Sequence, residues 1–150
     1  MPGFDEAAVR RAIDGCPQAD GYTLTVKPLR YRTQPSLSAI TVFDDREITC
    51  KIPEPFLPFG EVVIYGMKRR NTDPPRFVPL SEGITFRTRA EVVRFLYLHE
   101  WYHWWLFSTG ERFQRETACD RFALAGWRKR RVTLEDARLA IKRREEPRIW

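Results

Sequence analysis

Both histidines of the chain lie in one short segment, His99-Glu100-Trp101-Tyr102-His103. Positions four apart lie on one face of a helix, about one turn apart, so the two imidazoles can bind a single metal ion. Glu100 is rotated about 100° from His99 around the helix axis, so it can reach a water molecule on the metal without being a ligand. Zinc held by neutral imidazoles lowers the pKa of its water toward ~7, and a neighbouring carboxylate can accept the proton. The pattern therefore predicts a hydrolytic zinc centre with ligands His99 and His103 and with Glu100 as general base.

The residues before this segment predict the helix that has to position it. Thr88 and Glu91 have the spacing of a capping box, so a helix should begin near Arg89. Apolar residues then recur at helical spacing on the same face as the two histidines, namely Val92, Phe95, Leu96 and Leu106. The histidines should therefore face the core, where buried imidazoles need hydrogen-bond partners or a metal ion.

A third protein ligand has to come from another residue type, because no other histidine is present. Ser108-Thr109-Gly110 predicts a turn, and residues 111 to about 129 predict a second helix. In an antiparallel pair of helices, positions equidistant from the turn lie at the same height. His103 is seven residues before Gly110 and Glu116 is six residues after it, so the two side chains should be level.

The environment of Glu116 supports this choice but leaves alternatives open. Glu116 shares one predicted helix face with Phe113, Asp120, Ala123 and Trp127, and a carboxylate among apolar neighbours is costly unless a cation meets it. Asp120 should lie near His99 and accept the second N–H of its ring. Two alternatives exchange these roles: Asp120 is the ligand and Glu116 supports it, or the soft thiol of Cys119 is the ligand.

These residues resemble a known family. The His99-Glu100-x-x-His103 motif, followed by a Glu116-to-Ala123 run, resembles the gluzincin metallopeptidases, especially the minigluzincins and the ImmA/IrrE-like peptidases. In those families a glutamate on the next helix is the third ligand. The register after Glu116 is one residue looser here, since Cys119 precedes Asp120. The resemblance covers about residues 88–127, and it implies a zinc-dependent endopeptidase with ligands His99, His103 and Glu116 and with Glu100 as general base.

The first half of the chain predicts mainly strands. A short helix is expected over residues 4–14, and strands are expected over 22–26, 39–43, 47–52, 61–67 and either 76–80 or 83–86. Asp44-Asp45-Arg46 should form a hairpin turn, and the proline-rich segment 53–58 should form a loop. Strands followed by helices predict an α+β fold, in which a small, mostly antiparallel, twisted sheet packs against the motif helix and the following glutamate helix, as in zincins.

In such a layout a peptide substrate would add a strand to an exposed sheet edge above the metal, and segment 61–67 is the candidate edge. Peptide hydrolysis also requires a group that stabilises the oxyanion. Tyr65, Tyr97 and Tyr102 have suitable chemistry, and the sequence does not distinguish between them. The neighbouring aromatic run, residues 101–107, is explained better by core packing than by a binding platform.

Length and composition limit the classes of protein. With 150 residues and 43% hydrophobic residues, the chain is expected to form one zincin-like domain over residues 1–150. Three scattered cysteines argue against a disulfide framework, and no apolar run approaches the ~20 residues of a membrane span. The beginning of the sequence lacks the pattern of a signal peptide. An intracellular, cytoplasmic protein without membrane attachment is therefore expected.

The end of the chain is basic. Residues 126–150 hold nine Lys or Arg and four acids, which gives +5 of the formal net charge of +6. Thr133 should cap a last helix that reaches about Arg144, within a basic helical extension over about residues 128–150. A basic surface could contact nucleic acid, and the alternative function is a nucleic-acid-associated binding protein with a structural or vestigial metal site. A solvated helix face with interleaved acids explains the charge better, so a protein or peptide substrate remains the expected partner.

Overall fold

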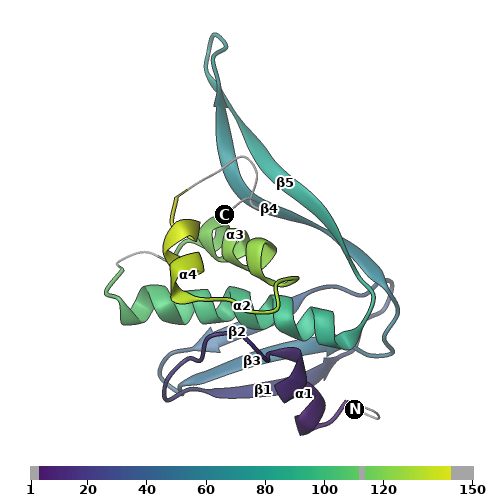
Figure 1. Ribbon diagram of the computed structural model, residues 1–150. Helices are drawn as coiled ribbons and strands as arrows, with labels where there is room; N and C mark the ends of the chain where they lie inside the picture. The colour runs from purple at the N-terminus through teal and green to yellow at the C-terminus, as the bar shows by residue number, and fades with distance from the viewer. Residues whose placement is uncertain (1–3, 112–113, 143–150) are drawn as a thin grey trace.

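The computed structural model describes residues 4–111 and 114–142 and confirms an α+β fold with helices and two small sheets. The elements follow in the order α1 (Glu6–Ala12), β1 (Thr23–Leu29), β2 (Ser38–Val42), β3 (Glu47–Pro53), β4 (Phe59–Arg70), β5 (Arg76–Phe86), α2 (Arg89–Ser108), α3 (Glu116–Gly126) and α4 (Leu134–Ala140). In Figure 1, α2 crosses the molecule between the three-stranded sheet on one side and α3 and α4 on the other.

The three-stranded sheet has the order β1-β3-β2. Strands β2 and β3 form the predicted antiparallel hairpin through residues 44–46, whereas β1 pairs with β3 in parallel. This parallel pair departs from the expected single sheet of mostly antiparallel strands. The order has a physical reason: β3 is the most buried strand and lies in the centre, while β1 contains Pro28, which lacks a backbone N–H and is tolerated at an edge.

Strands β4 and β5 form a separate two-stranded antiparallel sheet. The two short strands that the sequence offered as alternatives, 76–80 and 83–86, are parts of the single strand β5. Its partner β4 is also longer than the predicted 61–67. Figure 1 shows that the far half of this hairpin extends well away from the helices.

The motif helix α2 begins where the sequence predicts. The side chain of Thr88 accepts a hydrogen bond from the backbone of Glu91, and the Glu91 side chain accepts one from the Thr88 backbone, which completes the capping box. Because the sheet and α3 cover opposite sides of α2, residues on most of its circumference are buried. Trp101 and Tyr102 are both fully buried, so the interpretation of the aromatic run as core packing is confirmed for them. Phe107 is the exception: it is 54% exposed and stacks on Phe43.

The second helix of the hairpin begins later than predicted. Gly110 has φ +83° and ends the turn, but α3 starts at Glu116 instead of Glu111. Arg115, the residue before α3, has an extended backbone and provides no side-chain cap. Phe113, which the sequence placed on the inner face, lies outside the described residues. Glu116 is therefore the first residue of its helix, and its carboxylate points toward α2.

The last helix has the predicted cap. The Thr133 side chain accepts a hydrogen bond from the backbone of Asp136, and α4 ends at Ala140. The predicted end near Arg144 lies outside the described residues. All three cysteines are free, as expected. Within residues 4–111 and 114–142, no helix is both long enough and apolar enough to cross a lipid bilayer.

Candidate metal centre

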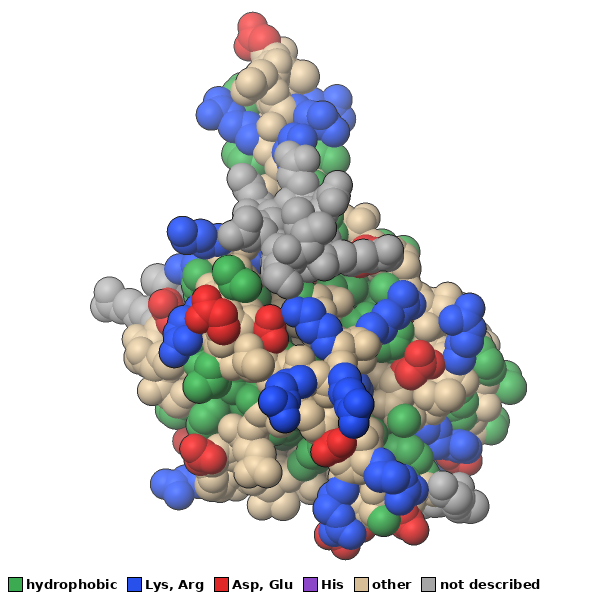
Figure 2. Space-filling model, in the orientation of Figure 1, with side chains coloured by type: hydrophobic (Ala, Val, Ile, Leu, Met, Phe, Trp, Pro, Cys, Tyr) green, Lys and Arg blue, Asp and Glu red, His purple; other side chains and the backbone are tan. Residues whose placement is uncertain are grey.

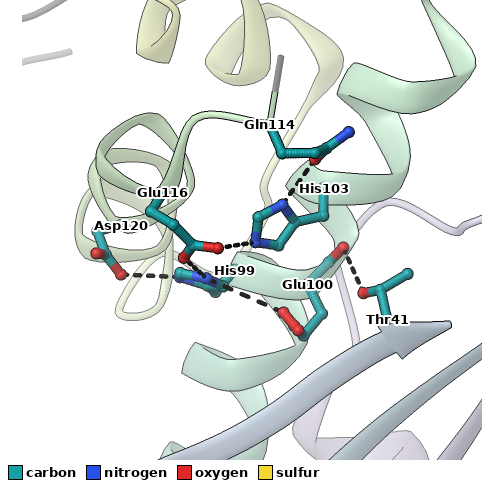
Figure 3. Close-up of polar contacts among 7 residues, drawn as sticks. All are labelled: Thr41, His99, Glu100, His103, Gln114, Glu116 and Asp120. Carbon is teal, nitrogen blue, oxygen red and sulfur yellow. Dashed lines mark hydrogen bonds and ion pairs between the residues drawn. The ribbon is translucent and has the colours of Figure 1, made fainter. Parts of the chain in front are cut away.

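Helices α2 and α3 bring His99, His103 and Glu116 together (Figure 3). The two imidazoles are one helical turn apart, with ring centroids separated by 5.1 Å. Glu116 reaches between them: its Oε1 lies 2.9 Å from Nε2 of His103, and its Oε2 lies 3.0 Å from Nε2 of His99. Two nitrogens and a carboxylate from the residues with predicted ligand roles therefore converge on one point.

The other ring nitrogen of each histidine faces an oxygen. Nδ1 of His99 lies 2.8 Å from Oδ1 of Asp120, and Nδ1 of His103 lies 2.7 Å from the side-chain oxygen of Gln114. Both rings can therefore donate from Nδ1, which leaves the lone pair of a neutral ring at Nε2. Two such lone pairs and a carboxylate repel one another unless a proton or a metal ion lies between them. The donor set thus fits a metal ion.

Gln114 is a site residue that sequence reasoning missed. It lies between the turn and α3, where a glutamine belongs to no periodic pattern, and its contact with His103 depends on how the chain enters α3. Asp120, by contrast, lies beside His99, as predicted from the similar height of these two positions along the antiparallel helices.

Glu100 lies beside the two histidines in the buried part of the site. It is only 4% exposed, and its Oε2 lies 4.0 Å from Nε2 of His99. Its backbone carbonyl accepts a hydrogen bond from the Thr41 hydroxyl at 3.2 Å, which ties α2 to β2 (Figure 3). Burial raises the pKa of Glu100, against the lowering effect of the histidine charges. A carboxyl group with a raised pKa suits proton transfer near neutral pH.

The electrostatics of the site favour positive charge. Burial lowers the pKa of His99, but the hydrogen bonds to Asp120 and Glu116, together with the nearby carboxylate charges, raise it overall to about 10. The hydrogen bond from His99 is also the main reason why the pKa of Glu116 is lowered. A bound cation would take the place of this proton and satisfy the same carboxylates.

Cys119 is an alternative third ligand. Its Sγ and one nitrogen from each of His99 and His103 lie within 4.8 Å of one another, so these three residues could hold a metal ion. Cys119 is completely buried, however, and burial raises the pKa of its thiol, which disfavours the thiolate that binds metals. Glu116 fits better, because its oxygens already lie within hydrogen-bonding distance of both Nε2 atoms.

A cavity of about 230 Å³ opens onto these residues. Its walls include segment 37–39 at the start of β2, together with Phe95, Leu96 and the side chains of the metal centre. Strand β2 is an edge of its sheet, and within the described part of the chain no strand pairs with its outer side. The prediction of segment 61–67 as the edge beside the metal is therefore wrong: that segment lies in the β4–β5 hairpin and does not line the cavity.

The three tyrosines considered for the oxyanion do not line this cavity either. The hydroxyl groups of Tyr97 and Tyr102 donate to the backbone carbonyls of Pro17 and Ala137, at 2.7 and 2.8 Å. Tyr65 is buried, and its backbone carbonyl accepts a hydrogen bond from Arg121.

Many cations of the C-terminal region have local partners. Lys129 forms an ion pair with Asp136 at 3.0 Å, Arg138 pairs with Glu135 at 3.1 Å, and the guanidinium of Arg128 lies over the ring of Trp127. These contacts agree with a solvated helical surface. The remaining basic residues of the predicted extension, from position 143 onward, lie outside the described residues.

Comparisons with protein-family models, with curated proteins and with solved structures found no match to this chain.

Proposed function

We propose that this protein is a zinc-dependent metallopeptidase of the gluzincin type, with His99, His103 and Glu116 as ligands. The observation that carries the proposal is the convergence of two Nε2 atoms and the Glu116 carboxylate beside the buried Glu100. Two histidines and one carboxylate are a known ligand set of catalytic zinc sites, which leave a position open for water or substrate. Bound there, zinc would supply Lewis acidity, which acidifies water and polarises the carbonyl of a peptide bond.

Asp120 and Gln114 hold the two imidazoles in place. Because each accepts a hydrogen bond from Nδ1, each fixes the ring orientation and directs the Nε2 lone pair toward the same point. Ordering the ligands before the metal arrives reduces the entropy lost on binding.

Glu100 is the general base in this proposal. Its carboxylate takes a proton from the attacking water, and the same oxygen then gives a proton to the nitrogen of the leaving amine. The burial that raises its pKa helps the first step, because it makes the carboxylate a stronger base.

The start of β2 provides the surface on which a peptide would lie. An extended peptide can add to the outer edge of β2 through backbone hydrogen bonds, which places its carbonyl groups along the cavity wall formed by residues 37–39. The Thr41–Glu100 hydrogen bond keeps this edge at a fixed distance from the general base.

Replacing Glu100 by Gln tests the proposal. Glu100→Gln should retain about one zinc per chain and lose hydrolysis of an unfolded protein substrate by ~100-fold or more, because the amide has nearly the same shape but cannot accept the proton. Zinc content and release of labelled peptides from denatured casein are the measurements. Glu135→Gln, on the exposed face of α4, is the matched control and should behave like the original protein. Full activity of Glu100→Gln would remove Glu100 from the mechanism.

A further inference from the structure

The far half of the β4–β5 hairpin forms an arm, defined here as residues 68–77. Figure 1 shows this arm standing away from the helices, and Figure 2 shows Lys and Arg side chains on both of its sides. It contributes little to the metal centre, since none of its residues lines that cavity. A long two-stranded projection buries few of its own side chains and gains little stability from them. Stabilisation of the fold therefore does not explain why the arm is present.

The arm has a strong excess of positive charge. It contains Lys68, Arg69, Arg70 and Arg76 against the single acid Asp73, which gives 4 − 1 = +3 over ten residues. The three arginines are exposed, and none of them takes part in an ion pair with another described residue. In this respect the three arginines differ from the cations of the C-terminal region, several of which have acidic or aromatic partners.

The strand register places these charges where they destabilise the isolated hairpin. Arg70 lies directly opposite Arg76, and Arg69 lies opposite Phe77. Alternation along the strands puts Lys68, Arg70 and Arg76 on one face of the ribbon, with Arg69 and Phe77 on the other. Like charges directly opposite one another are unfavourable, so this pattern is explained best by an anionic partner that separates them.

The shape and side chains of the arm indicate which kind of anionic partner fits it. A two-stranded ribbon has the width that enters a groove of duplex DNA, where phosphates lie on both sides of it. Phe77 is 63% exposed and can contact sugars or bases once the ribbon is in the groove. A membrane surface fits less well, because the turn itself is polar and carries Asp73. We propose that the arm binds duplex DNA by entering a groove, independently of the metal centre.

Fluorescence anisotropy with a labelled duplex of about 20 base pairs, measured with the full chain over a range of salt concentrations, tests this proposal. Each lost phosphate contact lowers the slope of log affinity against log salt by about 0.9. Arg69→Gln/Arg70→Gln/Arg76→Gln should therefore lower that slope by about 2 to 3 and weaken binding by about tenfold or more. The control Arg128→Gln/Arg130→Gln/Arg131→Gln removes the same charge from exposed positions near α3 and should change the affinity much less.

Further measurements separate the arm from general charge effects. Phe77→Ala should weaken binding several-fold without changing the salt slope, because the ring makes no phosphate contact. Arg70→Gln alone should lower the slope by about one, and it provides the test if the triple variant does not fold. The proposal is overturned if no duplex binding occurs at low salt, if both triple variants lose the same affinity, or if a single strand or an anionic vesicle binds more tightly than the duplex.

Discussion

At the scale of single residues, the site depends on how each imidazole is held. His99 and His103 each present Nε2 to Glu116, and each uses Nδ1 for a second oxygen, from Asp120 in one case and from Gln114 in the other. The spacing of the motif predicted that the side chains of His99, Glu100 and His103 lie close together, and the structure places them so. The position of Gln114 could not be predicted, because its contact is made across the turn by a segment with no periodic pattern.

The two supporting residues should therefore affect metal binding without abolishing it. Asp120→Ala and Gln114→Ala should each weaken zinc affinity by about 10- to 100-fold, because they remove an acceptor of the Nδ1–H bond but leave all three proposed ligands. Competition with a zinc chelator measures this affinity. Glu116→Ala should cause a much larger loss than either. If Asp120→Ala were the more damaging change, Asp120 would be the ligand and Glu116 its support.

At the scale of elements, features encoded by neighbouring residues could be predicted from the sequence, whereas others could not. The capping box at Thr88 and the turn at 44–46 are local, so the sequence predicted the start of α2 and the β2–β3 hairpin correctly. The parallel pairing of β1 with β3 joins segments that are distant in the sequence, and the late start of α3 has no side-chain cap to mark it. Neither could be inferred from periodicity or from turn residues.

Gly15 allows a test of how the elements are joined. Gly15 has φ +78°, its carbonyl accepts a hydrogen bond from the backbone of Val132, and an added Cβ would lie 2.0 Å from the carbonyl oxygen of Arg130. Gly21 has nearly the same φ, +79°, with nothing within 4 Å of an added Cβ.

Gly21→Ala should therefore lower the free energy of unfolding by only about 1 to 2 kcal/mol, the cost of a left-handed backbone for an L-residue. Gly15→Ala carries the same cost and also forces the C-terminal segment away from α1, so its effect should be larger by at least about 1 kcal/mol. Urea unfolding of both variants measures the difference. Equal effects would show that the contact between Gly15 and Arg130 contributes nothing to stability.

At the scale of the whole molecule, the structure combines a compact body, which contains the candidate metal centre, with a basic arm that extends from it (Figure 1). The fold class followed from the order of strands and helices in the sequence. The arm did not, because the sequence indicated only one short strand, over either 76–80 or 83–86, whereas the structure has a single long strand across both segments. That the cations of the arm form a cluster is evident only from the strand pairing, which places Arg70 directly opposite Arg76.

The charge balance of the site should determine how the stability of the metal-free protein varies with pH. His99 has a pKa raised from 6.5 to about 10, and Glu100 has a pKa raised above 4.5, so folding takes up protons at both positions. When the folded state binds more protons than the unfolded state, stability decreases with rising pH. The contribution of His99 should be complete below pH 6.5 and should be lost as the pH rises toward about 10.

Urea unfolding of chelator-treated protein between pH 6 and pH 10 measures this dependence. The free energy of unfolding should fall over the range in the original protein, and His99→Gln should flatten the decrease. A stability that rises with pH in this range would mean that His99 is not protonated in the metal-free site.

We propose that His99, His103 and Glu116 hold one zinc ion. Elemental mass spectrometry of the purified protein, with Glu116→Ala and Cys119→Ser measured beside it, tests this assignment. About one zinc per chain is expected in the original protein and in Cys119→Ser, and the metal should be lost in Glu116→Ala. Absence of a transition metal even after zinc is supplied would contradict the metal centre, and loss of zinc in Cys119→Ser with retention in Glu116→Ala would assign the third ligand to the thiol.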